Sequence, residues 1–301
     1  MLLMEQSLCR NYVDIDAAIE KFYGSEPISS AKKFARIVGL KDRSKEIDFI
    51  LGFAYARRID DCIDSGSDPV LAGRVIEEHE RNLNAIISNG GVVPYDEDSA
   101  ILGRLYSSYG PGILESFLGL FYGFRVDNYI ISTGKPVCKD MLDKRHLSQN
   151  LSAFQLMNIV NSGKELKYSE DFKDLVKVWT TYDAIIDFKE DLESGLILFS
   201  EEELHERDIR FRIGENIPEK FGYFLHEKRK EVTKGLLAKA HSVDETNFGF
   251  AEKLMLKAYF RSRVIKLARK DLCPDGIIYH ANGSMYDMPY PDFCPDFCPD
   301  F

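Results

Sequence analysis

The sequence is poor in cysteine, lacks an excess of basic residues and contains no long apolar run. Six cysteines in 301 residues are too few for a disulfide framework, so a reducing cytoplasm is the expected compartment. The net charge of −10 argues against general nucleic-acid binding, which depends on neutralising phosphates with Lys and Arg. It leaves room for an anionic substrate, because metal ions can reverse the local charge of a site. The longest apolar run, FLGLFYGF, is far shorter than the roughly 20 residues that cross a bilayer.

Strand-like alternation is also scarce, and the pattern that is present is helical. Apolar residues recur at spacings of three and four, and Gly and Pro cluster between the periodic segments. No Gly/Ser linker or shift in composition divides the chain, so we predict a single all-α domain over residues 1–270. The periodic segments are 44–64, 70–88, 111–131, 141–161, 171–193, 217–240 and 247–270.

Residues 271–301 form a tail of different composition, rich in Pro, Asp, Tyr and Phe, that ends in PDFCPDFCPDF. Prolines this frequent forbid a helix, so a loose tail draped over the surface is predicted. The tripeptide CPD recurs at Cys273, Cys294 and Cys298. A metal site on these cysteines is disfavoured, because no His or second Cys pair completes it.

The stretch RRIDDCID places a cluster of charge at the end of an apolar helix. On a helix Asp60 and Asp64 are one turn apart on one face, Asp61 flanks them, and Arg57 lies one turn earlier. Like charges at this spacing repel each other, so the cluster lowers stability unless something positive lies beside it.

A second row of carboxylates follows in TTYDAIIDFKEDLESG, where Asp183, Asp187 and Asp191 are each four residues apart. Two helices with such rows can face each other across a bundle and hold divalent ions between them. Oxygen-only ligands favour hard cations, and Mg²⁺ keeps coordination positions for water and phosphate oxygens, so the two rows indicate a diphosphate site. The alternative is a pair of solvated acidic faces, and the apolar setting of both rows favours metal binding. The predicted metal ligands are Asp60, Asp61, Asp64, Asp183, Asp187 and Asp191.

These residues resemble the motifs of the squalene/phytoene synthases. The first row matches the family's Y-x-x-C-R-x-x-D-D-x-x-D, with Ala56 in place of the cysteine. The second matches N-x-x-x-D-x-x-E-D-x-x-x-G-x-x-x-x-P-x-x-E-L, with Asp183 in place of the asparagine, and Glu203 in register. Weaker matches are SSAKKFARI near the start, GFRVDNY between the motifs, and AYFRSRVIKLARKD, which is similar to the final helix.

The resemblance implies an all-α isoprenoid synthase bundle with a central cavity, in which Mg²⁺ ions hold prenyl diphosphates. Loss of diphosphate would leave an allylic cation, and a second prenyl chain would attack it head to head through a cyclopropyl intermediate. Farnesyl and geranylgeranyl diphosphate are the implied substrates, and a peripheral membrane contact for product release is a further expectation. The implied catalytic residues are Asp60, Asp64, Asp187 and Asp191, and the implied substrate-binding residues are Lys32, Phe34, Phe53, Arg57 and Asp127.

The sequence departs from the family pattern in two further places. The basic run R-R-G-R after the second motif is replaced by ESGL, and the tract Y-C-Y-x-V-A-G by RHLSQNLSAF, which contains Arg145 and His146. For His146 a satisfied structural histidine is the expected role. Three functions therefore stay open: head-to-head joining of two prenyl diphosphates, cyclisation or transfer of a single prenyl diphosphate on the same fold, and binding by a non-catalytic relative.

Overall fold

The computed structural model describes residues 42–64, 68–91, 97–210, 217–272, 278–279 and 285–286, and it is helical apart from one pair of short strands. The all-α prediction is therefore confirmed. The helices are α4 Arg43–Asp64, α5 Pro69–Ser88, α6 Glu97–Tyr109, α7 Pro111–Thr133, α8 Lys139–Ser162, α9 Glu170–Ile186, α10 Phe188–Ser194, α11 Glu201–Glu206, α12 Glu219–Lys239 and α13 Phe250–Leu272, with a 3₁₀ turn η1 at Ala240–Glu245.

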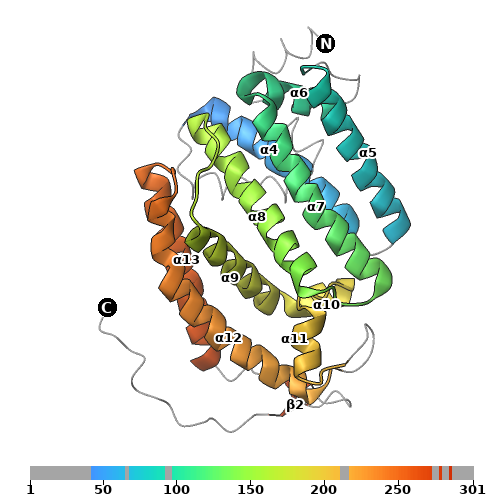
Figure 1. The fold of residues 1–301 in the computed structure, drawn as a ribbon, viewed down its shortest axis with the longest axis vertical. Helices are drawn as coiled ribbons and strands as arrows, with labels where there is room; N and C mark the ends of the chain where they lie inside the picture. The colour runs from blue at the N-terminus through green and yellow to red at the C-terminus, as the bar shows by residue number, and fades with distance from the viewer. Residues whose placement is uncertain are drawn as a thin grey trace.

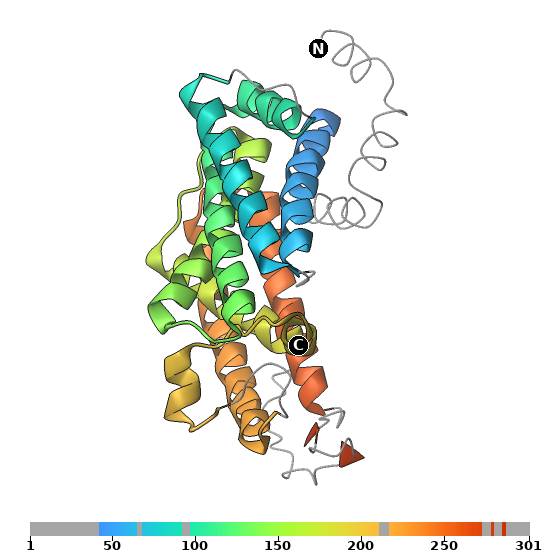
Figure 2. The ribbon, with the colours of Figure 1, turned by 90° about the vertical axis from the view of Figure 1, so that its right-hand side faces the viewer.

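Helix α8 links two groups of helices. It packs against α7 and α4 on one side and against α9 on the other, while α12 contacts both α9 and α13 (Figure 1). Figure 2 shows α4 and α5 side by side, with α7 in contact with both. A residue in the middle of α8 can therefore lie close to α4, α7 and α9 together.

The helix ends follow from local sequence. The Asp68 side chain accepts hydrogen bonds from the backbone N–H groups of Val70 and Leu71, and Pro69 occupies the first turn of α5. Helices α7 and α8 end at Gly134 and Gly163, both in the left-handed conformation that glycine adopts without strain. The predicted breaks at these positions are confirmed, whereas the periodic segments omit α6 and α11.

One predicted helix is divided. The sequence predicts a single helix over 171–193, but α9 ends at Ile186 and α10 begins at Phe188. Asp187 between them has φ −96° and ψ 4°, outside the helical range. Aspartate disfavours helix interiors because its side chain competes for backbone hydrogen bonds, and periodicity of apolar residues carries no sign of this.

Two glycines let α7 and α8 approach closely. A Cβ added at Gly119 would lie 2.0 Å from Oγ of Ser152, and one at Gly123 would lie 3.0 Å from Cβ of Gln149. Rising numbers in α7 thus meet falling numbers in α8, so the two helices are antiparallel. Asp127 lies one further turn along the same face of α7.

Buried side chains form one core that runs from Phe49 in α4 to Phe260 in α13. Aromatic pairs are frequent in it, including Tyr55 edge-on to Phe117, with ring centroids 5.3 Å apart. Among the helices that the structure describes, none has the length and apolarity needed to cross a membrane.

In the tail, strands β1 (Ile278–Tyr279) and β2 (Met285–Tyr286) pair antiparallel. The CPDF repeat lies outside the described residues, as do Lys32 and Phe34. The domain boundaries predicted at 1–270 and 271–301 stay predictions.

Candidate functional site

The first aspartate row lies at the C-terminal end of α4, and Arg57 supplies positive charge beside it. Arg57 Nη1 lies 2.7 Å from Oδ2 of Asp60, and its Nε lies 2.8 Å from Oδ1 of Asp61. The Asp60 side chain is 20% exposed and that of Asp61 is 48% exposed. Asp64 is the last residue of α4, and its side chain lies outside the described part of the structure. Part of the repulsion within this row is thus relieved by its own helix.

The second row crosses the junction of α9 and α10 without losing its register. The backbone N–H of Asp187 donates to the carbonyl of Asp183, and that of Asp191 donates to the carbonyl of Asp187, both at 2.9 Å. These are helical hydrogen bonds between residues four apart, so the three aspartates still follow one another at intervals of a turn. Asp187 is exposed, whereas Asp183 and Asp191 are half-buried.

Buried Arg145 on α8 interacts electrostatically with an aspartate of each row. It donates from Nε and Nη2 to Oδ1 and Oδ2 of Asp127 on α7, both at 2.8 Å, and both residues are buried. Burial lowers the pKa of Arg145, but Asp127, and then the charges of Asp60 and Asp191, raise it above its ordinary value. Because Asp60 and Asp191 belong to different rows, α4 and α10 both bring negative charge near this guanidinium.

Helix α13 brings a second arginine to the start of the second row. Arg263 donates from Nη2 to Oη of Tyr259 at 2.5 Å, and its guanidinium lies 4.5 Å from the centre of that ring and 5.4 Å from that of Tyr182. Burial lowers the pKa of Arg263, while Tyr259, Tyr182 and the charge of Asp183 raise it above its usual value. The residues that follow Asp191 supply no basic run. The tertiary structure instead brings the charges of Arg145 and Arg263, from α8 and α13, to the rows.

The other motif residues have structural surroundings. Phe53 is half-buried against the core, and the centre of its ring lies 6.3 Å from that of Phe49. Gly195, with φ of 91°, ends α10 in the left-handed conformation. Glu203 forms a capping box with Ser200 at the start of α11 and an ion pair with Lys228 of α12 at 2.6 Å.

His146 follows Arg145 and is buried. Its pKa is held well below the ordinary value by burial and by the charges of Arg145 and Lys177, so the ring is neutral near pH 7. The expectation of a satisfied histidine is not met at Nε2, which is buried and has no hydrogen-bond partner among the described residues.

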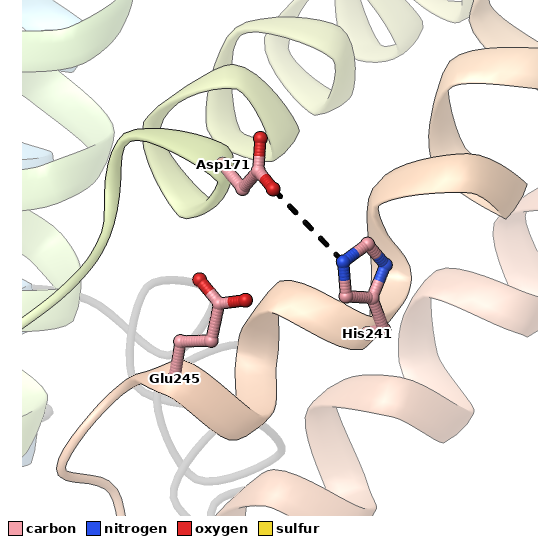
Figure 3. Close-up of side chains that lie close together, drawn as sticks. All are labelled: Asp171, His241 and Glu245. Atoms are coloured by element: carbon pink, nitrogen blue, oxygen red, sulfur yellow. Dashed lines mark ion pairs between the residues drawn. The ribbon is translucent and has the colours of Figure 1, made fainter.

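Among the residues that the structure describes, three ligand atoms within 4.8 Å of one another occur at Asp171, His241 and Glu245 (Figure 3). This group lies in the first turn of α9 and in η1, about 24 Å along α9 from Asp187 at 1.5 Å per residue. Lys239 Nζ already lies 2.5 Å from Oδ1 of Asp171, which places a competing cation there. The group is therefore separate from the aspartate rows.

The donor set of the two rows fits Mg²⁺ by its chemistry. All its members are carboxylates, which are the ligands of hard cations. The described row residues include no group of three ligand atoms within 4.8 Å of one another. Mg²⁺ does not require such a group, because it binds through one or two carboxylates and completes its octahedron with water and phosphate oxygens. The identification of these residues as ligands stays a prediction.

The arginines were missed as partners of the rows because their positions depend on long-range packing. The available signal was Arg145 itself, which stands where the family has its Y-C-Y-x-V-A-G tract, with Asp127 on the preceding helix. A buried arginine requires an anion beside it, which makes Asp127 a candidate partner. The rule does not say how α7 and α8 are aligned, so it does not predict the contact.

The comparisons with known proteins support the fold. The crystal structure of a dehydrosqualene synthase in complex with ligand is similar to this chain, with a TM-score of 0.57 and 14% sequence identity. The similarity covers 84% of this chain and 89% of that chain. No family model matches the sequence, and no curated protein matches it. The chain therefore shares its helical fold with that dehydrosqualene synthase.

Proposed function

We propose that the protein is a Mg²⁺-dependent isoprenoid synthase that ionises an allylic prenyl diphosphate and joins two prenyl chains head to head. The observation that carries the proposal is the approach of two aspartate rows, from α4 and from α9–α10, to one buried guanidinium in a fold of this class.

The residues divide the work between binding an anion and excluding water. Asp60, Asp61 and Asp64, with Asp183, Asp187 and Asp191, would hold Mg²⁺, which neutralises the departing diphosphate when bound. Aromatic side chains of the core exclude water, and aromatic ring faces can stabilise a cation.

The second candidate is an enzyme of the same fold that ionises one prenyl diphosphate and then cyclises it or transfers it to another acceptor. The observation that favours it is the segment after the second row. There the family's basic run is replaced, and residues 196–200 are buried apolar side chains and a serine instead of phosphate-binding groups. A single diphosphate would need fewer positive charges than two.

Product analysis separates these candidates. Pure protein is incubated with Mg²⁺ and with farnesyl or geranylgeranyl diphosphate, and the extract is analysed by mass spectrometry. Head-to-head joining predicts a hydrocarbon or diphosphate with the carbon count of two prenyl chains. A product with the carbon count of one chain supports the second candidate and contradicts the first. Omission of Mg²⁺ is the control.

A further inference from the structure

The packing of α7 on α8 fixes the position of the Arg145 guanidinium. Gly119 and Gly123 bring the two backbones together, and Asp127 is the next residue on that face. The Asp127 carboxylate accepts hydrogen bonds from both Nε and Nη2 of Arg145. This bidentate contact sets the plane of the guanidinium as well as its position. Both side chains are at least 93% buried, so solvent does not loosen this contact.

The register of α8 against α9 places Arg145 at the level of the second row. Asn150 Nδ2 donates to Oγ1 of Thr180 at 2.8 Å, and α8 and α9 are antiparallel neighbours (Figure 1). About one turn back along α8 from Asn150 is Arg145, and about one turn forward along α9 from Thr180 is Asp183, where the row begins. Helix α4, which ends with the first row, packs on α8, and the charge of Asp60 acts on Arg145.

The Arg145–Asp127 contact leaves donors unused. An arginine carries five N–H groups, and two of those of Arg145 are directed at Asp127. No other hydrogen bond of Arg145 is formed within the described residues. The remaining N–H groups lie on Nη1 and on the outer side of Nη2, so they point away from Asp127.

A purely structural role explains this pair poorly. Replacing a buried ion pair by apolar residues of similar volume is often neutral or stabilising, so the pair gains little for the fold. It does place a permanent positive charge, which no change in pH near neutrality removes, beside two rows of carboxylates.

We propose that Arg145 binds the diphosphate group held between the two aspartate rows, and that Asp127 is the positioning residue that orients it. Arg145 then takes the place of basic residues that the chain lacks after Asp191. This inference rests on the proposed function, and it assigns to Asp127 a role beside the substrate contact predicted from its motif.

The test removes the pair as a unit. The double variant Asp127→Leu/Arg145→Met leaves no unpaired buried charge, so it is expected to fold and to melt close to the wild-type temperature. Binding of inorganic pyrophosphate in Mg²⁺ is measured by isothermal titration calorimetry, at one ionic strength. We expect ~10- to 100-fold weaker binding, the range for loss of hydrogen bonds to a charged group.

The matched control is Glu80→Gln/Arg125→Gln, which removes an ion pair between α5 and α7 with N and O 3.3 Å apart. It should bind pyrophosphate as the wild type does. A folded Asp127→Leu/Arg145→Met protein with wild-type affinity overturns the role of Arg145. If that variant does not fold, Arg145→Lys decides: it keeps the charge but loses the planar donors, so unchanged affinity overturns the proposal and a weakened one supports it.

Failure of the proposed function gives a different result. A wild-type protein that binds no pyrophosphate with Mg²⁺ contradicts the diphosphate site altogether, and the role of Arg145 with it. Binding by the wild type and equally by the double variant contradicts the role of Arg145 alone.

Discussion

At the residue scale, the site depends on charges that are held in place by other charges. Arg57 neutralises part of the first row along its own helix, whereas Arg145 reaches the rows from a different helix and is fixed by Asp127. Asp60 and Asp191 belong to different rows, yet the charges of both raise the pKa of the same buried guanidinium, that of Arg145.

Substitution of row aspartates tests their role as ligands. Asp60→Ala or Asp187→Ala should lower turnover of prenyl diphosphate about 100-fold or more, because several kcal/mol of charge stabilisation depend on the bound metal. Steady-state kinetics at saturating Mg²⁺ measures the effect. Asp171→Ala is the control, since Asp171 lies on α9 but at its opposite end. Wild-type turnover in either row variant would show that the row does not hold a required ion.

Removal of Arg145 alone tests the buried pair. Arg145→Met leaves the Asp127 carboxylate buried without its partner, so the free energy of unfolding should fall by about 3–5 kcal/mol. The double variant Asp127→Leu/Arg145→Met should recover most of this loss. Urea denaturation of the three proteins measures both values, and equal stability of the single and double variants would contradict the pairing.

At the element scale, close packing and caps set where the site residues lie. Gly119 and Gly123 control the distance between α7 and α8, and hence the register of Asp127 against Arg145. The segment after α10 is held by the capping box of Ser200 and Glu203 and by Lys228 from α12. The glycines thus position the helices that carry Asp127 and Arg145, and the capping box holds the segment that follows the second row.

A methyl group at Gly119 should crowd Ser152 on α8. Gly119→Ala places Cβ 2.0 Å from Oγ of Ser152, which must rotate away, and 3.2 Å from Cβ of Ser152, a tight contact that remains; we expect a loss of about 1 kcal/mol, the lower end of the range for overpacking. Gly222→Ala in α12 is the control, because its Cβ would meet nothing within 4 Å and alanine favours a helix. Thermal melting should show a loss for the first variant and no loss for the second, and the opposite order would contradict the close approach.

The Glu203 contact predicts a pH-dependent stability. Burial raises the pKa of Glu203, but Lys228 and Ser200 outweigh it, and the pKa lies below the usual value of 4.5. A carboxyl with a lowered folded pKa stabilises the fold above its unfolded pKa, and this stability is lost as pH falls through the folded pKa.

The measurement is the melting temperature of wild type and Glu203→Gln between pH 7 and pH 3. The wild type should be the more stable protein at pH 7, and the difference should shrink below about pH 4.5. The exposed neighbour Glu201→Gln is the control for the amide substitution. A difference that stays constant with pH would contradict the ion pair with Lys228.

At the scale of the whole molecule, the sequence predicts the class of fold and the two acidic rows, because both depend on spacing within a helix. Helical periodicity gives α4, α5, α7 and α8 nearly to their ends. The break at Asp187 and the pairing of Asp127 with Arg145 were not predicted. The break reflects the low preference of aspartate for helix interiors, and the pairing depends on how α7 packs on α8; apolar spacing specifies neither.

The central claim is that the two rows use Mg²⁺ to remove diphosphate from a prenyl chain. The most direct test is the rate of diphosphate release from farnesyl and geranylgeranyl diphosphate by the wild-type protein, with Mg²⁺ and with excess chelator. Release should be fast with Mg²⁺ and fall to the uncatalysed rate with chelator, because carboxylates alone repel the leaving anion. Release at the background rate with both substrates in Mg²⁺ would contradict the claim.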